Sequence, residues 1–149
     1  MTNKTLIPPN GNKHFYESVA IYNWPCDATP KGCTPYPGEK PLPPSECNNS
    51  TGLPWVPCDG QVDTSAVDAG DAPTAGKFME SVVTLAQAGF FFDDDAYFTK
   101  AADLIRVFCV NSASYMVPEL LYGQSQPGRN NGSHGVMIEW TRLSQVADA

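Results

Sequence analysis

Four side chains that can bind an anion or move a proton fall close together in the last third of the chain. Within thirteen residues that carry no helical pattern stand Tyr122, Gln124, Arg129 and His134. Tyrosine and histidine can transfer protons to and from a reacting group. The planar guanidinium of arginine binds a carboxylate through paired hydrogen bonds. The combination predicts a loop site that neutralises an anionic ligand and moves a proton.

Several candidate residues also have a purely structural interpretation. Tyr122 is equally well explained as a buried aromatic whose hydroxyl caps a loop. Trp24 serves equally well as a stacking platform for a sugar ring or as an anchor in the core. His14, next to Lys13 near a predicted surface turn, fits a solvated side chain better than a functional one. Arg129, among glycine and asparagine, is the best candidate for gripping a carboxylate.

Proline and glycine divide the chain into two unlike parts. The sequence has 14 prolines and 12 glycines, and most of them precede Pro73. Frequent proline breaks helices and interrupts strand ladders, so residues 1–72 are predicted to be irregular. The stretch 15–24 fits a helix or a strand equally well, because both periodicities are satisfied there.

After residue 72 the apolar residues recur at helical spacing. They predict one helix over 73–91 and a second over 95–110, with carboxylates between them as stop and cap. Two such helices pack antiparallel as a hairpin. Residues 135–146 predict the beginning of a third helix. The sequence thus predicts one all-α domain over 1–149, and further helices are expected to follow it, as in a truncated product.

The cysteines indicate an oxidising compartment. Four of them stand in the proline-rich part: Cys26, Cys33, Cys47 and Cys58. Their spacing contains no Cys-x-x-Cys pair, which favours at least one loop disulfide over a zinc site. Cys109, between two apolar residues of a helical pattern, is predicted to be a buried thiol without a catalytic role.

Glycosylation acceptors support the same compartment. They are Asn3, the overlapping pair Asn48 and Asn49, and Asn131. The first five residues lack the features of a signal peptide, so a secreted protein would have its signal peptide outside this chain. No run of about eighteen apolar residues occurs, and hence no membrane span is predicted.

Four stretches, in this order, resemble the alginate lyase domain family. Residues 11–16 (Gly-Asn-Lys-His-Phe-Tyr), leading to Tyr22-Asn23-Trp24-Pro25, are similar to Gly-Asp-Lys-His-Asp-Tyr and Tyr-Trp-Trp-Pro of the family. Asp59-Gly60-Gln61-Val62 resembles Arg-Asp-Gly-Gln-Val. The predicted helix pair is joined by residues 91–97, which contain Phe-Asp-Asp-Asp-Ala-Tyr. They stand where the family has Thr-Gly-Asp-Glu-Ala-Tyr. Residues 116–124 and 127–130 resemble Met-Asn-Pro-Asn-Leu-Asn-Tyr-Ala-Gln and Pro-Gly-Arg-Asn.

The resemblance implies a fold and an activity. Members of the family are toroids of paired helices that cleave uronate polymers by β-elimination, which would make this all-α chain part of an incomplete toroid. The implied catalytic residues are Tyr122, Arg129 and His134. The implied substrate-binding residues are Trp24, Tyr22, Gln124 and His14. The reaction scheme requires no metal and no cofactor.

Departures from the family pattern keep a second function open. Asn23 replaces a tryptophan, Val117 and Leu121 replace asparagines, and Glu139 replaces an aspartate. The Asn-Asn-His-Gly stretch that usually carries a catalytic histidine does not appear before Ala149. The alternative is a secreted, disulfide-stapled module that uses Trp24, Trp55 and Tyr122 to hold glycan without cutting it.

The charge balance restricts the partners. A formal net charge of −7 and a pI near 4.6 argue against nucleic acid, whose phosphates require a basic surface. An acidic polysaccharide is repelled at long range as well. Its binding therefore demands a local cluster of cations and neutral donors inside an acidic surface, and Arg129 is expected to carry most of that binding.

Overall fold

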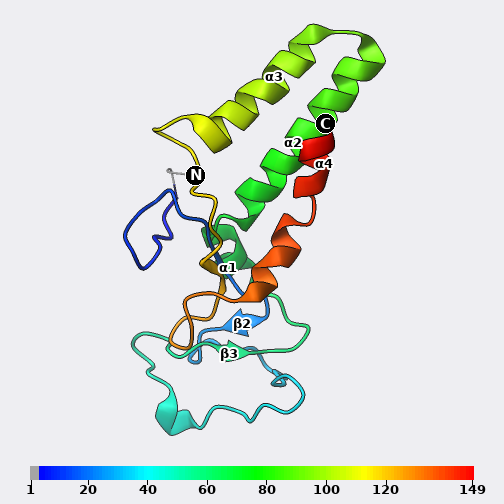
Figure 1. Cartoon of the computed structure of the whole chain (residues 1–149). Helices are drawn as coiled ribbons and strands as arrows, with labels where there is room; N and C mark the ends of the chain where they lie inside the picture. Colours follow the sequence, from blue (N-terminus) through cyan, green and yellow to red (C-terminus); the bar gives the residue numbers. More distant parts are fainter. Residues whose placement is uncertain (1–3) are drawn as a thin grey trace.

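Helices occupy one end of the molecule, and loops with short strands occupy the other (Figure 1). The computed structural model describes residues 4–149, so the acceptor Asn3 lies outside the described residues. α2 (Ala72–Phe92) and α3 (Asp95–Ile105) run antiparallel. The predicted helical hairpin is therefore confirmed. Among residues 4–149, no helix has the length and apolar character needed to cross a bilayer.

The hairpin turns at the acidic residues identified in the sequence. Asp93 adopts a left-handed conformation (φ 51°) and closes α2 through its N–H to the carbonyl of Gly89. The side chain of Asp94 then caps α3 by accepting a hydrogen bond from the N–H of Ala96 at 2.9 Å. Caps of this kind satisfy backbone groups that the helix leaves unpaired. The two helices consequently end and begin within three residues.

The core lies between α2 and the segments that cross its inner face. Met79 and Val82 of α2 are almost completely buried, at 1% exposure each. Phe78 stacks on Phe108 with ring centroids 4.0 Å apart and planes 4° from parallel. Trp140 lies against Phe108 from the carboxyl-terminal segment. Aromatic burial of this kind contributes most of the stability of a small core.

The end of α3 corrects the prediction for Cys109. From Arg106 to Val110 the chain continues as a π-helix, η2, rather than as the α-helix predicted to residue 110. A π turn inserts an extra residue into the helical repeat and rotates the residues after it about the helix axis. Phe108 therefore stays buried while Cys109 is exposed. The prediction of a buried thiol was wrong.

Short strands join distant parts of the chain. β1 (Glu17–Val19) pairs in parallel with β4 (Tyr122–Ser125), and a bulge separates its two registered pairs. β2 (Asn23–Trp24) pairs antiparallel with β3 (Val56–Pro57). The all-α fold class was therefore wrong, because helices and sheets both build the domain. The expected ring of paired helices is not confirmed by the described residues.

The remaining helices are short. α1 (Thr64–Ala69) is capped by Asp63, whose side chain accepts hydrogen bonds from two backbone N–H groups. η1 (Pro44–Glu46) is a single 3-10 turn. The predicted third helix is divided into the 3-10 helix η3 (His134–Trp140) and α4 (Leu143–Asp148), and α4 lies beside α2 (Figure 1). Carboxyl-terminal residues thus reach the core by a tight turn and a short helix.

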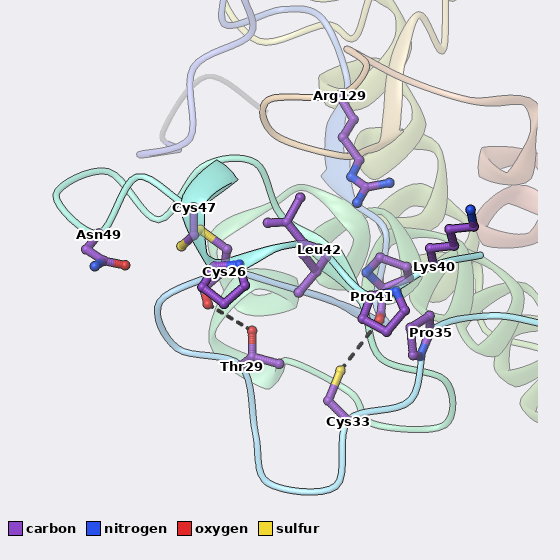
Figure 2. Close-up of a pocket in the computed structure, with 13 residues that line it drawn as sticks. Cys26, Thr29, Cys33, Pro35, Lys40, Pro41, Leu42, Cys47, Asn49 and Arg129 are labelled. Atoms are coloured by element: carbon purple, nitrogen blue, oxygen red, sulfur yellow. Dashed lines mark hydrogen bonds between the residues drawn. A yellow bond between two sulfur atoms is a disulfide. The ribbon is translucent and has the colours of Figure 1, made fainter.

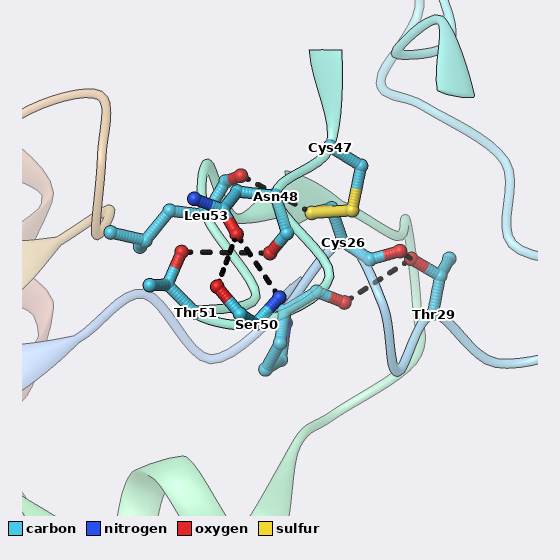
Figure 3. The surroundings of a disulfide bond; sticks show 8 residues. Cys26, Thr29, Cys47, Asn48, Ser50, Thr51 and Leu53 are labelled. Atoms are coloured by element: carbon cyan, nitrogen blue, oxygen red, sulfur yellow. Dashed lines mark hydrogen bonds between the residues drawn. A yellow bond between two sulfur atoms is a disulfide. The ribbon is translucent and has the colours of Figure 1, made fainter. Parts of the chain in front are cut away.

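Two disulfides hold the proline-rich loops of residues 25–58, here called the disulfide lobe. Cys26 is bonded to Cys47, and Cys33 to Cys58, with Cα atoms 5.7 and 4.9 Å apart. Figure 3 shows the first bond beside a turn in which the Asn48 side chain accepts from Ser50. The prediction of at least one loop disulfide is confirmed. Covalent links replace the hydrophobic core that these residues lack.

A later loop is fixed onto this lobe. The carbonyl of Pro127 accepts a hydrogen bond from the N–H of Trp55 at 2.9 Å. Gly128 has φ +78°, and a Cβ there would lie 2.8 Å from the Cα of Pro54. Only glycine fits this close approach in a left-handed conformation. The turn that carries Arg129 is therefore positioned by the disulfide lobe.

Candidate active site and an adjoining pocket

Three side chains donate hydrogen bonds to one carboxylate at the base of the helical region. The hydroxyl of Tyr16 lies 2.5 Å from Glu139 Oε2, and the hydroxyl of Ser18 lies 2.7 Å from the same oxygen. The amide nitrogen of Gln124 donates to Glu139 Oε1 at 2.5 Å. Hydrogen bonds to an ionised group are shorter and stronger than neutral ones. These four residues are called the Glu139 cluster.

Three elements from distant parts of the sequence build this cluster. Tyr16 precedes β1, Ser18 lies on β1, Gln124 lies on β4, and Glu139 lies on η3. The β1–β4 pairing sets Ser18 beside Gln124, whose backbone N–H donates to the Ser18 hydroxyl at 2.9 Å. Ser18 therefore accepts from Gln124 and donates to Glu139. The hydroxyl forms the link between strand and 3-10 helix.

Gly123 allows η3 to approach β4. A Cβ at this buried glycine would lie 2.0 Å from Cγ2 of Val136. Real carbon atoms do not approach so closely, so the absence of a side chain is required for the contact. Val136 is itself buried at 4% exposure. The small residue beside Gln124 therefore determines how near Glu139 comes to it.

The backbone of Gln124 is strained. Its φ is +51°, in the left-handed region that residues other than glycine rarely adopt. Such a conformation costs about 1–3 kcal/mol and persists only where surrounding contacts impose it. The contacts here are the bonds to Ser18 and Glu139. Strain of this kind concentrates at functional sites, where it fixes the orientation of a side chain.

The cluster holds its negative charge with donors. In the described part of the chain, no cation forms an ion pair with Glu139. Burial, followed by the hydrogen bond and the charge of Glu139, raises the pKa of Tyr16 well above its ordinary value of 10.0. Tyr16 consequently remains a protonated donor at all physiological pH values. It is suited to hold Glu139, and unsuited to act as a base.

The residues predicted to do chemistry lie around this cluster and beyond it. Gln124 is part of it. Tyr122 is half-buried on β4, with its ring edge-on to Phe15 at 5.8 Å between centroids. His134 is exposed at the first position of η3, the element that also carries Glu139. Tyr122 and His134 therefore stand on the same two elements that position Gln124 and Glu139.

Two predicted substrate residues have structural partners. The indole N–H of Trp24 donates to the carbonyl of Gln61 at 2.9 Å. His14 Nδ1 lies 2.7 Å from the carbonyl oxygen of Tyr115, and the two rings are 4.7 Å apart. Each contact joins segments far apart in sequence. Trp24 and His14 therefore stabilise the loops around the site through these contacts.

The other two predicted residues belong to the disulfide lobe or border it. Tyr22 is half-buried, and its carbonyl accepts a hydrogen bond from the N–H of Cys58 at 2.7 Å. Arg129 lines a cavity of about 340 Å³ in the lobe. A guanidinium nitrogen of Arg129 lies 3.9 Å from Glu39 Oε2, a long ion pair. The predicted site residues are thus distributed between the Glu139 cluster and this pocket.

Three members of the cluster were not predicted from the sequence. Tyr16 and Glu139 were noted only within motifs, and Ser18 only as a position in the stretch 15–24 that fits a strand or a helix. Glu139 has a recognisable signal, since it is the only charged residue in the apolar run from Gly135 to Trp140. A lone carboxylate in such a run requires hydrogen-bond donors. Nothing local indicates that Tyr16 and Ser18 supply them, because they lie more than a hundred residues away.

Comparisons with known proteins place the chain in a family. The alginate lyase family model matches residues 1–149, and the chain belongs to that family. Among solved structures, an alginate lyase from Bacteroides ovatus is similar, with a TM-score of 0.76 and 29% sequence identity over 98% of this chain. The chain spans 33% of the length of that lyase. No curated protein matches it.

Proposed function

We propose that the protein is a polysaccharide lyase acting on an acidic, uronate-containing polysaccharide such as alginate. One observation carries the proposal: the match to an alginate lyase over 98% of the chain includes the segment in which Glu139 and Ser18 hold Gln124 in a strained conformation. The two disulfides support a secreted location, because such bonds persist in oxidising compartments.

The proposed reaction is a β-elimination. A base removes the proton from C5 of a uronate, the C5–H electron pair forms the C4–C5 double bond, and the C4–O bond breaks. The leaving oxygen then takes up a proton. Neutral donors and cations that neutralise the sugar carboxylate stabilise the developing negative charge. The product is an unsaturated sugar at the new chain end.

Named residues supply these roles in the proposal. Gln124 in the Glu139 cluster and Arg129 in the lobe pocket each bind a sugar carboxylate, and Tyr122 and His134 exchange protons with C5 and the leaving oxygen. Trp24, Tyr22 and His14 contact neighbouring sugars. Glu139 acts through Gln124 by fixing the orientation of its amide. It is a positioning residue in this scheme, since it does not touch the substrate.

The second candidate is the alternative already named from the sequence. A chain that holds uronate with Trp24, Trp55 and Tyr122 without cleaving it would be a glycan-binding module. The two functions share a ligand and differ only in whether unsaturated product forms.

The ultraviolet absorbance of unsaturated product separates the two functions. The 149-residue chain alone should give little or no rise on polyuronate, and a version extended through an Asn-Asn-His-Gly stretch should give a steady rise. In that version, Gln124→Ala should lower kcat by roughly tenfold or more, because a transition-state donor is lost. Uronate binding by the extended version without any absorbance change would favour the glycan-binding module.

A further inference from the structure

The pocket in the disulfide lobe has walls that are fixed by covalent bonds. Cys26 and Cys47, which form one disulfide, both line it, as does Cys33 of the other. Proline supplies much of the remaining wall, and its locked φ leaves little freedom to collapse. The cavity measures about 340 Å³. That volume suits one or two sugar rings in a preformed site.

Both charged side chains that line the pocket are positive. They are Lys40 and Arg129, in a chain whose formal net charge is −7. Figure 2 shows the guanidinium of Arg129 pointing towards Leu42 and Pro41 on the opposite wall. An arginine fork and a lysine ammonium together recognise a carboxylate. The pocket is therefore a local positive site of the kind that an acidic surface needs for an anionic ligand.

The rest of the lining suits a sugar rather than a bare anion. Leu42 and Pro41 present apolar surface beside the cations, and Asn49 adds an amide at the other end (Figure 2). Sugars combine apolar ring faces with hydroxyls at their edges, and sites of mixed lining bind such ligands. The Thr29 hydroxyl is already directed to the carbonyl of Cys26 at 3.1 Å. The amide and the cations are the groups left to meet the ligand.

The weak ion pair with Glu39 leaves Arg129 available to a ligand. The only acid paired with Arg129 in the described residues is Glu39, at 3.9 Å and with 44% of its side chain exposed. An exposed pair at that distance contributes little. A ligand carboxylate that reaches the guanidinium bidentately can displace it.

We propose that this pocket is a binding subsite for one carboxylate-bearing sugar unit, with Arg129 and Lys40 as its anion-binding pair and Glu39 as a weak internal competitor. The proposal rests on the proposed function for the choice of a uronate. It adds Lys40, Glu39 and the lobe to the binding surface. Binding at this site requires no cleavage, so it can be tested on its own.

Calorimetric titration of the chain with a short oligouronate prepared from alginate tests the subsite. Arg129→Ala and Lys40→Ala should each weaken the affinity roughly tenfold, because each removes a charge-assisted contact. Glu39→Gln should strengthen it a few-fold. Lys77→Ala, an equal charge change on the exposed face of α2, should leave it unchanged. Far-UV circular dichroism confirms that each variant is folded.

Three outcomes would overturn the proposal. They are equal affinity for a neutral oligosaccharide of the same length, displacement of the oligouronate by an equal concentration of sulfate, and unchanged affinity in both the Arg129 and Lys40 variants. The ultraviolet absorbance of unsaturated product distinguishes failure of the subsite proposal from failure of the proposed lyase function. Cleavage by the extended version with no effect of Lys40→Ala or Glu39→Gln on its KM removes the subsite and leaves the lyase. Binding in the pocket without cleavage supports the subsite and contradicts the lyase function.

Discussion

Glu139 draws its partners from the opposite end of the chain. Tyr16 and Ser18 lie 123 and 121 residues away from it in sequence. Each bond joins a buried or half-buried donor to an ionised acceptor, and removal of one partner leaves the other without compensation. The cluster therefore stabilises the tertiary structure at the same point where it orients Gln124.

Tyr16→Phe should change both the stability of the protein and the pH dependence of that stability. At neutral pH we expect a loss of about 1.5–3 kcal/mol in the free energy of unfolding, because a hydrogen bond to a charged group disappears. The raised pKa of Tyr16 means that the folded protein keeps the proton as the pH rises through 10.0, while the unfolded chain loses it. Wild-type stability should thus be full below pH 10 and fall above it, and the variant should lack part of this fall.

Denaturant unfolding at several pH values between 8 and 11 measures these quantities. Tyr97→Phe on α3 serves as the control, since Tyr97 is 36% exposed. An alkaline slope that is the same in Tyr16→Phe and in the wild type would contradict the assignment of the buried, protonated hydroxyl.

At the residue scale, the chemical role suggested by a side chain's type was easier to predict than the residues that the side chain contacts. Arg129 was identified as an anion-binding residue from its type; it lines a pocket, and its anion-binding role stays a prediction. His14 fitted a solvated residue, and it is instead half-buried against Tyr115. The partners of Glu139 could not be predicted at all, because residues separated by over a hundred positions share no local pattern.

At the element scale, the hairpin was predictable and the sheets were not. α2 and α3 carry their signals within themselves, as caps and apolar residues at helical spacing. β1 and β4 contain three and four residues, which is too short for a period of two to stand out. Their stability comes from pairing with each other. The π turn at Arg106–Val110 was not expected from the helical spacing, and Cys109 was therefore misplaced.

Gly123→Ala should disrupt the junction between β4 and η3. The added methyl group would lie 2.0 Å from Val136, so we expect a loss of about 1–3 kcal/mol from overpacking. Because Gln124 is the next residue, the hydrogen bond to Glu139 should weaken too. Thermal and denaturant unfolding measure the loss.

A matched glycine lies within α2. Gly76 has nothing within 4 Å of an added Cβ, so Gly76→Ala should raise stability by about 0.5–1 kcal/mol through helix propensity. Equal effects of the two substitutions would show that propensity, and not the contact with Val136, determines the result at residue 123.

At the scale of the whole molecule, the two ends are stabilised by different interactions. Side-chain packing around Met79 and Val82 holds the helical end, whereas disulfides and turns hold the disulfide lobe. The loop that carries Arg129 rests on the lobe. Damage to the lobe should therefore affect the pocket more than the helices.

Removal of one disulfide tests this division. Cys26→Ala with Cys47→Ala opens a link between residues 21 apart, which in chain-entropy terms costs about 3 kcal/mol of lobe stability. We expect the affinity for an oligouronate to fall roughly tenfold or more, while the far-UV helical signal changes little. Ser45→Ala, an exposed substitution in the same loop, is the control. Loss of the helical signal together with binding would show that the two ends are not independent.

The parallel pairing of β1 with β4 has a consequence for biosynthesis. Glu17 is registered with Tyr122, 105 positions later in the chain. At a translation speed of about 5–20 residues per second, β1 waits roughly 5–20 seconds before its partner has been made. During that interval Tyr16 and Ser18 have neither Gln124 nor Glu139 to bond, and the backbone of β1 has no strand to pair with. The Glu139 cluster can therefore form only after Glu139 has been synthesised. At that point it joins Tyr16 and Ser18, near the start of the sequence, to Gln124 and Glu139, near its end.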